Sequence, residues 1–150
     1  MCPLAWPQES APSLILQGTN GQEHKLQQYS GRIVVLNFWA TWCTPCLHEM
    51  PILAATYKSY SRRDLVVLGA SLDDAKNLDA VNAVVRKYKI KYRVFINVST
   101  ESMESFGVES VPTTILLDRN GQIMARISGK VDQFALKRRI ETLLLNSHKP

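Results

Sequence analysis

Two uninterrupted apolar runs constrain the fold of this 150-residue chain more than any other feature. Residues 33–38 read Ile-Val-Val-Leu-Asn-Phe and residues 65–70 read Leu-Val-Val-Leu-Gly-Ala. Neither run alternates with polar residues, which is typical of strands covered on both faces at the centre of a parallel sheet. Between them, residues 44–60 lack glycine and place apolar residues at three- and four-residue steps, which predicts an amphipathic helix. The sequence therefore predicts a β-α-β unit.

Weaker patterns extend this unit into one layered α/β domain. The dipeptides Asn20-Gly21 and Asn120-Gly121 favour tight turns and predict two β-hairpins, over residues 14–26 and 113–127. The remaining predicted elements are helices over residues 77–88 and 132–145 and a strand over residues 94–96.

The first 13 residues hold three prolines among small and polar residues, a composition that resists regular structure. We therefore expect a flexible tether over residues 1–13, a single domain over residues 14–145 and a short tail over residues 146–150. No apolar run approaches the roughly 18 residues that a membrane-spanning helix needs. No basic segment followed by an apolar stretch marks a signal peptide, so we expect either a cytosolic protein or one whose targeting segment was removed.

The chain carries a formal net charge of +5, which favours acidic partners or anionic surfaces through long-range attraction. Residues 86–93 alone hold five basic residues interleaved with tyrosines. This run fits a surface for nucleic acid or for an acidic protein. It also fits cations that complement a helix end and protect a sheet edge, which is the interpretation we favour. We expect no nucleic-acid partner.

The sequence Trp42-Cys43-Thr44-Pro45-Cys46 stands where the first central strand ends and the predicted helix begins. Residues three apart on a helix lie about 5 to 6 Å from each other, so Cys43 and Cys46 can form and break a disulfide without backbone movement. The unpaired N–H groups of a helix N-terminus stabilise a thiolate, which makes Cys43 the expected nucleophile. Cys46, one turn inside the helix, is the expected resolving thiol, and Pro45 suits the first turn.

Other uses of the two cysteines are a structural disulfide, a pair of buried apolar thiols and a metal site. A structural zinc site needs four ligands, and Cys2, His24 and His148 offer no second paired spacing. His48, two residues after Cys46, could complete a copper site with the two thiols. We expect His48 to be a solvated helix residue and expect no bound metal.

Residues 38–46 (Phe-Trp-Ala-Thr-Trp-Cys-Thr-Pro-Cys), with Glu49, Pro51 and the sequence Val111-Pro112-Thr113, resemble the thioredoxin superfamily. The likeness is to its TlpA/ResA-like branch of membrane-anchored or periplasmic thiol-disulfide oxidoreductases, and it covers residues 14–145. It implies a thioredoxin-like three-layer α/β/α fold with an N-terminal β-hairpin. The stretch between residues 72 and 106 is similar to the central strand-helix insertion of that branch.

The resemblance also implies roles for individual residues. It makes Cys43 the nucleophile, Cys46 the resolving cysteine and Pro112 a cis-proline. Val111, which precedes this proline, is expected to offer backbone hydrogen bonds to a bound substrate segment. The residues expected to contact the substrate are Trp42, Pro45, Val111 and Pro112. No cofactor is expected beyond the redox-active disulfide Cys43–Cys46.

One position departs from the thioredoxin pattern. The buried acidic residue that thioredoxins place six positions before the first cysteine is Asn37 here, and an amide cannot shuttle a proton. The resemblance implies that this branch instead uses a glutamate three residues after the second cysteine, which is Glu49. The alternative is an ordinary exposed helix glutamate.

These features predict a protein thiol-disulfide oxidoreductase that reduces disulfides of extracytoplasmic protein partners. The Thr-Pro pair between the cysteines lacks the histidine that, by resemblance, marks strongly oxidising relatives. The resemblance implies a monomer in the periplasm, or anchored to a membrane and facing outward, that is recharged by a membrane thiol-reductant donor. Cytochrome c maturation is one common task of the branch. A tether could lie in a missing or N-terminal segment, where Cys2 could carry a lipid.

Two other functions compete with this prediction. A peroxiredoxin-like peroxidase shares the fold, but by resemblance its reactive cysteine needs Thr or Ser three residues earlier and Pro seven residues earlier. Those positions are Ala40 and Leu36 here. A copper-binding metallochaperone is the alternative from the binding class, and metal titration of the reduced protein discriminates it from a reductase.

Overall fold

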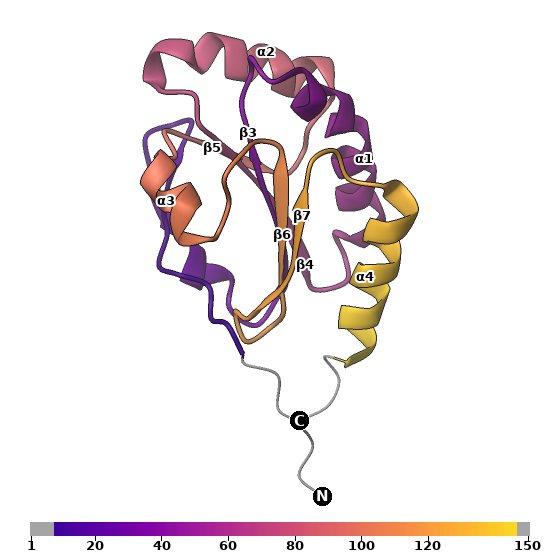
Figure 1. Cartoon of the computed structure of the whole chain (residues 1–150). Coiled ribbons are helices and arrows are strands. Elements are labelled where there is room, and N and C mark those ends of the chain that lie inside the picture. Colours follow the sequence, from indigo (N-terminus) through magenta and orange to yellow (C-terminus); the bar gives the residue numbers. More distant parts are fainter. Residues whose placement is uncertain (1–7, 147–150) are drawn as a thin grey trace, which may run out of the picture.

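The predicted β-α-β unit forms the centre of the molecule. A computed structural model describes residues 8–146 of the chain. Strands β3 (Ile33–Trp39) and β4 (Leu65–Ser71) pair in parallel, and helix α1 (Thr44–Tyr60) connects them. They lie in one mixed seven-stranded sheet with the order β2-β1-β5-β4-β3-β6-β7 (Figure 1). The apolar runs therefore predicted both the position and the direction of these strands.

The other elements follow the predicted order with small changes at their ends. The first hairpin is β1 (Ile15–Gly18) and β2 (Glu23–Lys25), and the second is β6 (Thr113–Leu117) and β7 (Ile123–Ser128). The helices and strand between and after them are η1 (Leu26–Tyr29), η2 (Ala75–Asn77), α2 (Leu78–Lys87), β5 (Arg93–Ile96), α3 (Thr100–Ser105) and α4 (Gln133–Asn146). Helix α3 was not predicted, because six polar-rich residues with one buried side chain, Met103, carry no helical periodicity.

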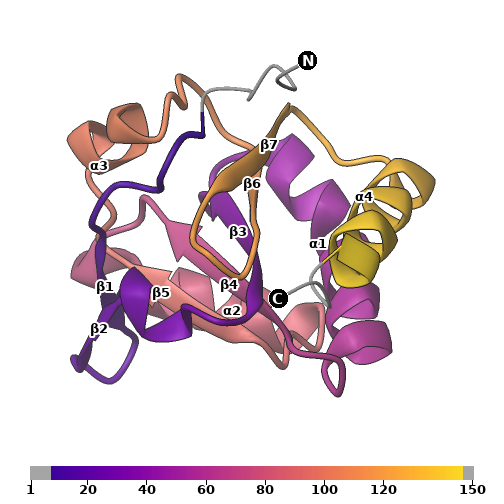
Figure 2. The ribbon, with the colours of Figure 1, turned by 90° about the horizontal axis from the view of Figure 1, so that it is seen from below.

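The sheet separates two apolar layers, as the three-layer prediction requires. Side chains alternate along β3, so Ile33 and Val35 pack toward α1, α2 and α4, whereas Val34 and Leu36 pack toward α3 and η1. Figure 2 shows α1 and α4 side by side on one side of the sheet and α3 on the other. Asn37 shares the parity of Ile33 and Val35, which points its amide toward α1.

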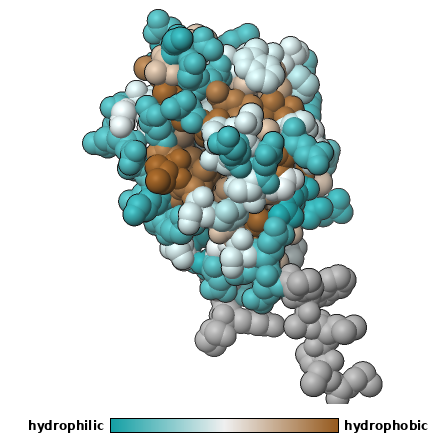
Figure 3. All heavy atoms as spheres, turned by 60° about the vertical axis from the view of Figure 1, so that its left-hand side comes forward, coloured by the Kyte–Doolittle hydropathy of each residue, from teal (hydrophilic) through white to brown (hydrophobic). Residues whose placement is uncertain are grey.

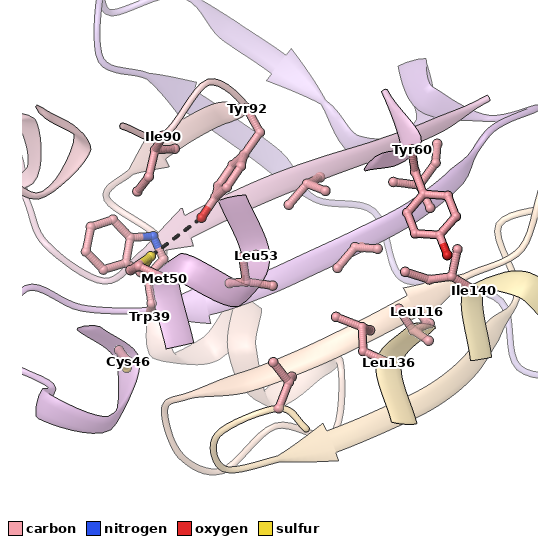
Figure 4. Close-up of a cluster of buried hydrophobic side chains, with 14 of the residues drawn as sticks. Trp39, Cys46, Met50, Leu53, Tyr60, Ile90, Tyr92, Leu116, Leu136 and Ile140 are labelled. Carbon is pink, nitrogen blue, oxygen red and sulfur yellow. Dashed lines mark hydrogen bonds between the residues drawn. The ribbon is translucent and has the colours of Figure 1, made fainter. Parts of the chain in front are cut away.

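The core under α1 fixes the position of this helix on the sheet. Met50 and Leu53 are fully buried, and the hydroxyl of Tyr92 donates to the sulfur of Met50 at 3.5 Å (Figure 4). A Cβ atom on Gly69 of β4 would lie 3.2 Å from Nε1 of Trp39 and 3.3 Å from Tyr92. A glycine in the middle of this strand therefore allows two aromatic rings to approach the sheet.

The beginning of the described chain differs from the predicted tether. The backbone N–H of Ala11 donates to Gly121, the N–H of Ile123 donates to the carbonyl of Glu9, and Ser10 forms an isolated bridge with Gln122. Residues 9–11 are therefore paired with the second hairpin, because its free edge offers backbone groups that an extended proline-rich segment can satisfy. The tether prediction is wrong for these residues. Residues 1–7 and most of the predicted tail lie outside the described residues.

The interpretation of the basic run as part of a sheet edge is wrong. Strand β5, which contains Arg93, lies between β1 and β4, and Lys89 and Lys91 lie in the turn that precedes it.

The face of the molecule in Figure 3 is mostly hydrophilic, with apolar atoms visible between polar side chains. Within residues 8–146, no helix combines the length and the hydropathy needed to cross a membrane.

Candidate active site

The two cysteines of the Cys-x-x-Cys sequence form a disulfide at the start of α1. Their Cα atoms are 5.2 Å apart, as the helical spacing predicts. Cys43 is the N-cap residue, and its sulfur accepts a hydrogen bond from the backbone N–H of Cys46 at 3.3 Å. Cys43 is 6% exposed and Cys46 is 0% exposed. Cys43 is thus the more accessible sulfur and occupies the position where backbone N–H groups favour a thiolate.

The local sequence explains why the helix begins here. Strand β3 ends at Trp39, and the backbone N–H of Cys43 bonds to the carbonyl of Ala40 at 3.2 Å, which turns the chain out of the sheet. Pro45 lies in the first helical turn, where no backbone donor is needed. Trp42 is 67% exposed beside the disulfide. The site therefore presents an aromatic ring and a proline to solvent next to the sulfur of Cys43.

Glu49 lies one helical turn past Cys46 and is fully buried. The alternative of an exposed helix glutamate is therefore wrong. Oε1 of Glu49 accepts from Nδ2 of Asn37 at 2.6 Å, and Oε2 accepts from the backbone N–H of Val131 at 3.1 Å. Burial raises the pKa of Glu49 above its usual value, and these two hydrogen bonds and the charge of Lys130 oppose the rise without cancelling it.

Asn37 allows Glu49 to change its protonation state inside the core. Nδ2 of Asn37 also lies 3.2 Å from Oγ1 of Thr114, and its Oδ1 has no partner among residues 8–146. A carboxylate at position 49 needs the Asn37 amide as a donor, whereas a neutral carboxyl group needs an acceptor. Rotating the amide by half a turn would bring Oδ1 to both Glu49 and the Thr114 hydroxyl, which can donate. Asn37 is thus suited to both forms of Glu49.

The loop before β6 supplies a candidate contact surface for substrate. The Val111–Pro112 peptide bond is cis, which confirms the prediction for this bond. Within residues 8–146, neither the backbone N–H nor the carbonyl of Val111 has a hydrogen-bond partner. Val111 packs against the apolar cluster that contains Cys43 and Cys46. An extended segment lying across this loop could therefore pair with the Val111 backbone.

A buried carboxylate holds the loop that carries the nucleophile. Asp73, which is 2% exposed, accepts at Oδ2 from the backbone N–H of Thr41 at 2.8 Å and at Oδ1 from the Thr41 hydroxyl at 2.7 Å. The hydroxyl of Ser71 donates to Oδ2 at 2.6 Å. Its neighbour Asp74 caps η2 instead, through the N–H of Lys76. Asp73 therefore fixes the residue two positions before Cys43.

We expect Asp73→Asn to loosen this loop. Asparagine replaces one of the two carboxylate oxygens with an NH2 group, which cannot accept a hydrogen bond. At least one buried donor of Thr41 or Ser71 therefore loses its acceptor, at a cost of about 1 to 3 kcal/mol. Denaturant unfolding of the oxidised protein measures this loss, and the rate of exchange with a small disulfide should fall with it. Asp74→Asn is the matched control, since asparagine keeps the cap. Equal stability and equal rates in both variants would contradict the role of Asp73.

The described residues hold no group of three or more His, Cys, Asp or Glu side chains placed to bind a metal ion. His48 is exposed on α1. Cys2 lies outside the described residues.

Three features of the site were not predicted from the sequence. Asn37 was interpreted only as a missing acid, although its alternation in β3 indicates that it faces α1. The backbone N–H of Val131 donates to Glu49 from 82 positions further along the chain, so no local sequence pattern indicates this contact. Asp73 has no distinguishing mark in the sequence, because Asp73 and Asp74 both precede the predicted helix over residues 77–88 and only burial separates them.

Comparisons with known proteins agree with this geometry. The model of the AhpC/TSA family matches residues 7–126 of the chain. Thiol-disulfide oxidoreductase ResA of Geobacillus thermodenitrificans is 31% identical over 134 residues, which are 89% of this chain and 76% of that protein. ResA of Bacillus subtilis is 28% identical over 82% of this chain and 68% of its own length. A crystal structure from Chlorobium tepidum, described as thiol:disulfide interchange protein DsbE, is 30% identical with a TM-score of 0.82 and covers 91% of this chain and 96% of its own.

Proposed function

This chain belongs to the AhpC/TSA family and is a ResA-like thiol-disulfide oxidoreductase of thioredoxin-like fold, and on that premise we propose that it reduces disulfides of protein partners outside the cytoplasm. The observation that carries the proposal is the disulfide at the N-terminus of α1 with the buried carboxyl group of Glu49 one turn beyond it. These groups supply a nucleophile, a resolving thiol and a proton acceptor within two turns of one helix.

The reaction proceeds by two thiol-disulfide exchanges. The Cys43 thiolate attacks one sulfur of the partner disulfide, which forms a mixed disulfide and releases the other partner sulfur as a thiolate. Cys46 then loses its proton to Glu49 and attacks the Cys43 sulfur. The partner leaves with two reduced sulfurs, one protonated by the proton that Glu49 took from Cys46 and the other by water. The Cys43/Cys46 dithiol has given up two electrons and is now the disulfide. A second dithiol must reduce this disulfide before the next cycle.

The surface around Cys43 favours a polypeptide as the partner. Trp42 and Pro45 are exposed beside the nucleophile, and aromatic side chains are frequent at protein contacts. The unpaired backbone of Val111 can add an extended partner segment by main-chain hydrogen bonds. A partner held in this way would bring its disulfide to Cys43 regardless of most of its side chains.

We propose that the direction is reduction and that the location is periplasmic or the outer side of a membrane. The Thr-Pro pair between the cysteines supports the direction. The resemblance to the TlpA/ResA-like branch supports the location, a membrane thiol-reductant donor and cytochrome c maturation as a candidate task. The two alternatives have less support. Ala40 and Leu36, which stand where a peroxidase would need Thr or Ser and Pro, are fully buried core residues.

A trapping experiment tests the proposed function. Cys46→Ser keeps the nucleophile and removes the resolving thiol, so the mixed disulfide with the partner should accumulate. Mass spectrometry of the trapped species from cells that export the protein should identify exported proteins with cysteine pairs. Reduction of hydrogen peroxide by the parent protein, without capture of any protein by the variant, would overturn the proposal in favour of a peroxidase.

A further inference from the structure

A basic, aromatic-walled groove lies at the far end of α1 from the active site. It encloses about 830 Å³ between the carboxyl-terminal part of α1 and the turn after α2, which lie side by side in Figure 2. Its walls carry two partly buried tyrosines and four exposed cations: Tyr57, Tyr88, Lys58, Arg62, Lys89 and Lys91. No acidic residue lines it. The groove thus combines an apolar interior with a rim of a single charge.

The packing of residues 89–92 explains how two of the four cations, Lys89 and Lys91, reach the rim of the groove. Ile90 and Tyr92 are 5% and 6% exposed and anchor the turn in the core, whereas Lys91 between them and Lys89 before them are exposed. The ring of Tyr92 contacts the ring of Tyr57 with centroids 6.2 Å apart, which joins the turn to α1. The groove is therefore held by packed core residues on both sides.

The four cations lack partners of opposite charge. Within residues 8–146, the ion pairs are Arg63 with Glu141, Arg119 with Asp64, and Arg126 with Glu9, and none involves a cation of the groove. A cleft lined by one sign of charge over apolar walls concentrates the electrostatic potential inside it. An anionic ligand with an apolar part would satisfy both features of this groove.

We propose that this groove binds an acidic segment of a protein partner, with an apolar side chain between the tyrosines and carboxylates at the four cations. A volume of this size matches the pockets that hold a few residues or a small ligand. A concave site suits a chain segment better than a flat anionic membrane, which contacts protruding side chains. The inference deepens the proposed function, because it gives the chemistry by which a partner is held.

The position of the groove suits a docking site separate from the exchange site. Tyr57 follows Cys43 by 14 residues along one helix, which corresponds to about 20 Å. A partner bound here would leave Cys43 free and would raise the local concentration of a disulfide elsewhere in its chain. Basic residues at this groove would then select acidic partners without entering the chemistry.

Direct binding of a cysteine-free peptide to the oxidised protein tests the groove. The probe is a fluorescein-labelled Asp-Glu-Leu-Phe-Glu-Asp peptide, followed by anisotropy at low salt, and Asn-Gln-Leu-Phe-Gln-Asn is the neutral control. The double variant Lys89→Glu/Lys91→Glu should weaken binding of the acidic peptide by at least about tenfold. A matched double variant at distant exposed cations, Lys76→Glu/Arg138→Glu, makes the same change in net charge and should weaken it less than about twofold.

A second variant and a second ligand keep the result decisive. Lys58→Gln/Arg62→Gln alters the opposite wall and should also weaken binding, which guards against a folding defect in the first variant. Equal weakening by the distant control, equal binding of the neutral peptide, or no binding would overturn the proposal. Binding to phosphatidylglycerol vesicles without binding to the peptide would overturn it in favour of a membrane site. Exchange with a small disulfide is measured separately, so its loss would instead count against the proposed function.

Discussion

A Cys43→Ser variant is expected to lose thiol-disulfide exchange by on the order of 10³-fold or more, with its fold intact. The thiolate is the attacking species, and a serine hydroxyl is not ionised at neutral pH, so the first exchange cannot begin. The N-terminus of α1 favours an anion at position 43, and Cys43 is the sulfur with the greater exposure. Reduction of a protein disulfide followed over time measures the loss.

Cys46→Ser is the matched control for this prediction, because both variants remove the same disulfide. It should retain the first exchange, release one partner thiolate per molecule, and then stop at the mixed disulfide. The two variants should therefore differ in reaction with a partner and agree in unfolding. If Cys46→Ser were inert and Cys43→Ser formed the mixed disulfide, the assigned roles would be reversed.

A Glu49→Gln variant is expected to slow resolution of the mixed disulfide by on the order of 10²-fold, a typical effect of removing a positioned acid or base. Glutamine keeps the size of the side chain and loses the ability to take the Cys46 proton. Its oxygen can accept from Val131, and its N–H can donate to the unpartnered Oδ1 of Asn37 after rotation of that amide. The turnover of the variant should lose part of its pH dependence.

The removed charge also has a predictable effect on the cysteines. Repulsion from an ionised Glu49 disfavours a nearby thiolate, so the variant should titrate its cysteines at lower pH than the parent. Thiolate absorbance against pH measures this shift. If thiol titration and turnover of the variant overlay those of the parent from about pH 5 to about pH 9, the Cys46 proton travels through water or another group.

The stability of the Glu49→Gln variant relative to the parent should change with pH in a predictable direction. The pKa of Glu49 is raised in the folded protein above 4.5, so the folded state holds this proton more tightly than the unfolded state does. The stabilisation from this group is complete below the unfolded pKa and is lost as the pH rises through the folded pKa. Glutamine has no such loss, so the stability of the variant relative to the parent should increase over that window. Thermal unfolding at about pH 4 and about pH 8 measures the change.

The sequence by itself determined the elements that local chemistry controls. Short continuous apolar runs are typical of buried strands, which predicted β3 and β4, and Asn-Gly turns predicted both hairpins. The helical spacing of Cys43 and Cys46 predicted their pairing, since that distance depends on backbone geometry alone. The position of the acid, Glu49, came from resemblance, and the sequence could not distinguish burial from exposure there.

Tertiary structure alone decided how distant groups meet. The burial of Glu49 depends on Asn37 of β3 and on the backbone of Val131, which are far apart in sequence, so no local pattern encodes the contact. Asp73 and Asp74 are identical as residues, yet one is buried against Thr41 and the other caps a helix. The basic run resembled a strand edge until strand order placed β5 inside the sheet. The physical reason is common to all three: hydrogen bonding and burial are satisfied between segments, and the partner segment is chosen by packing of the whole chain.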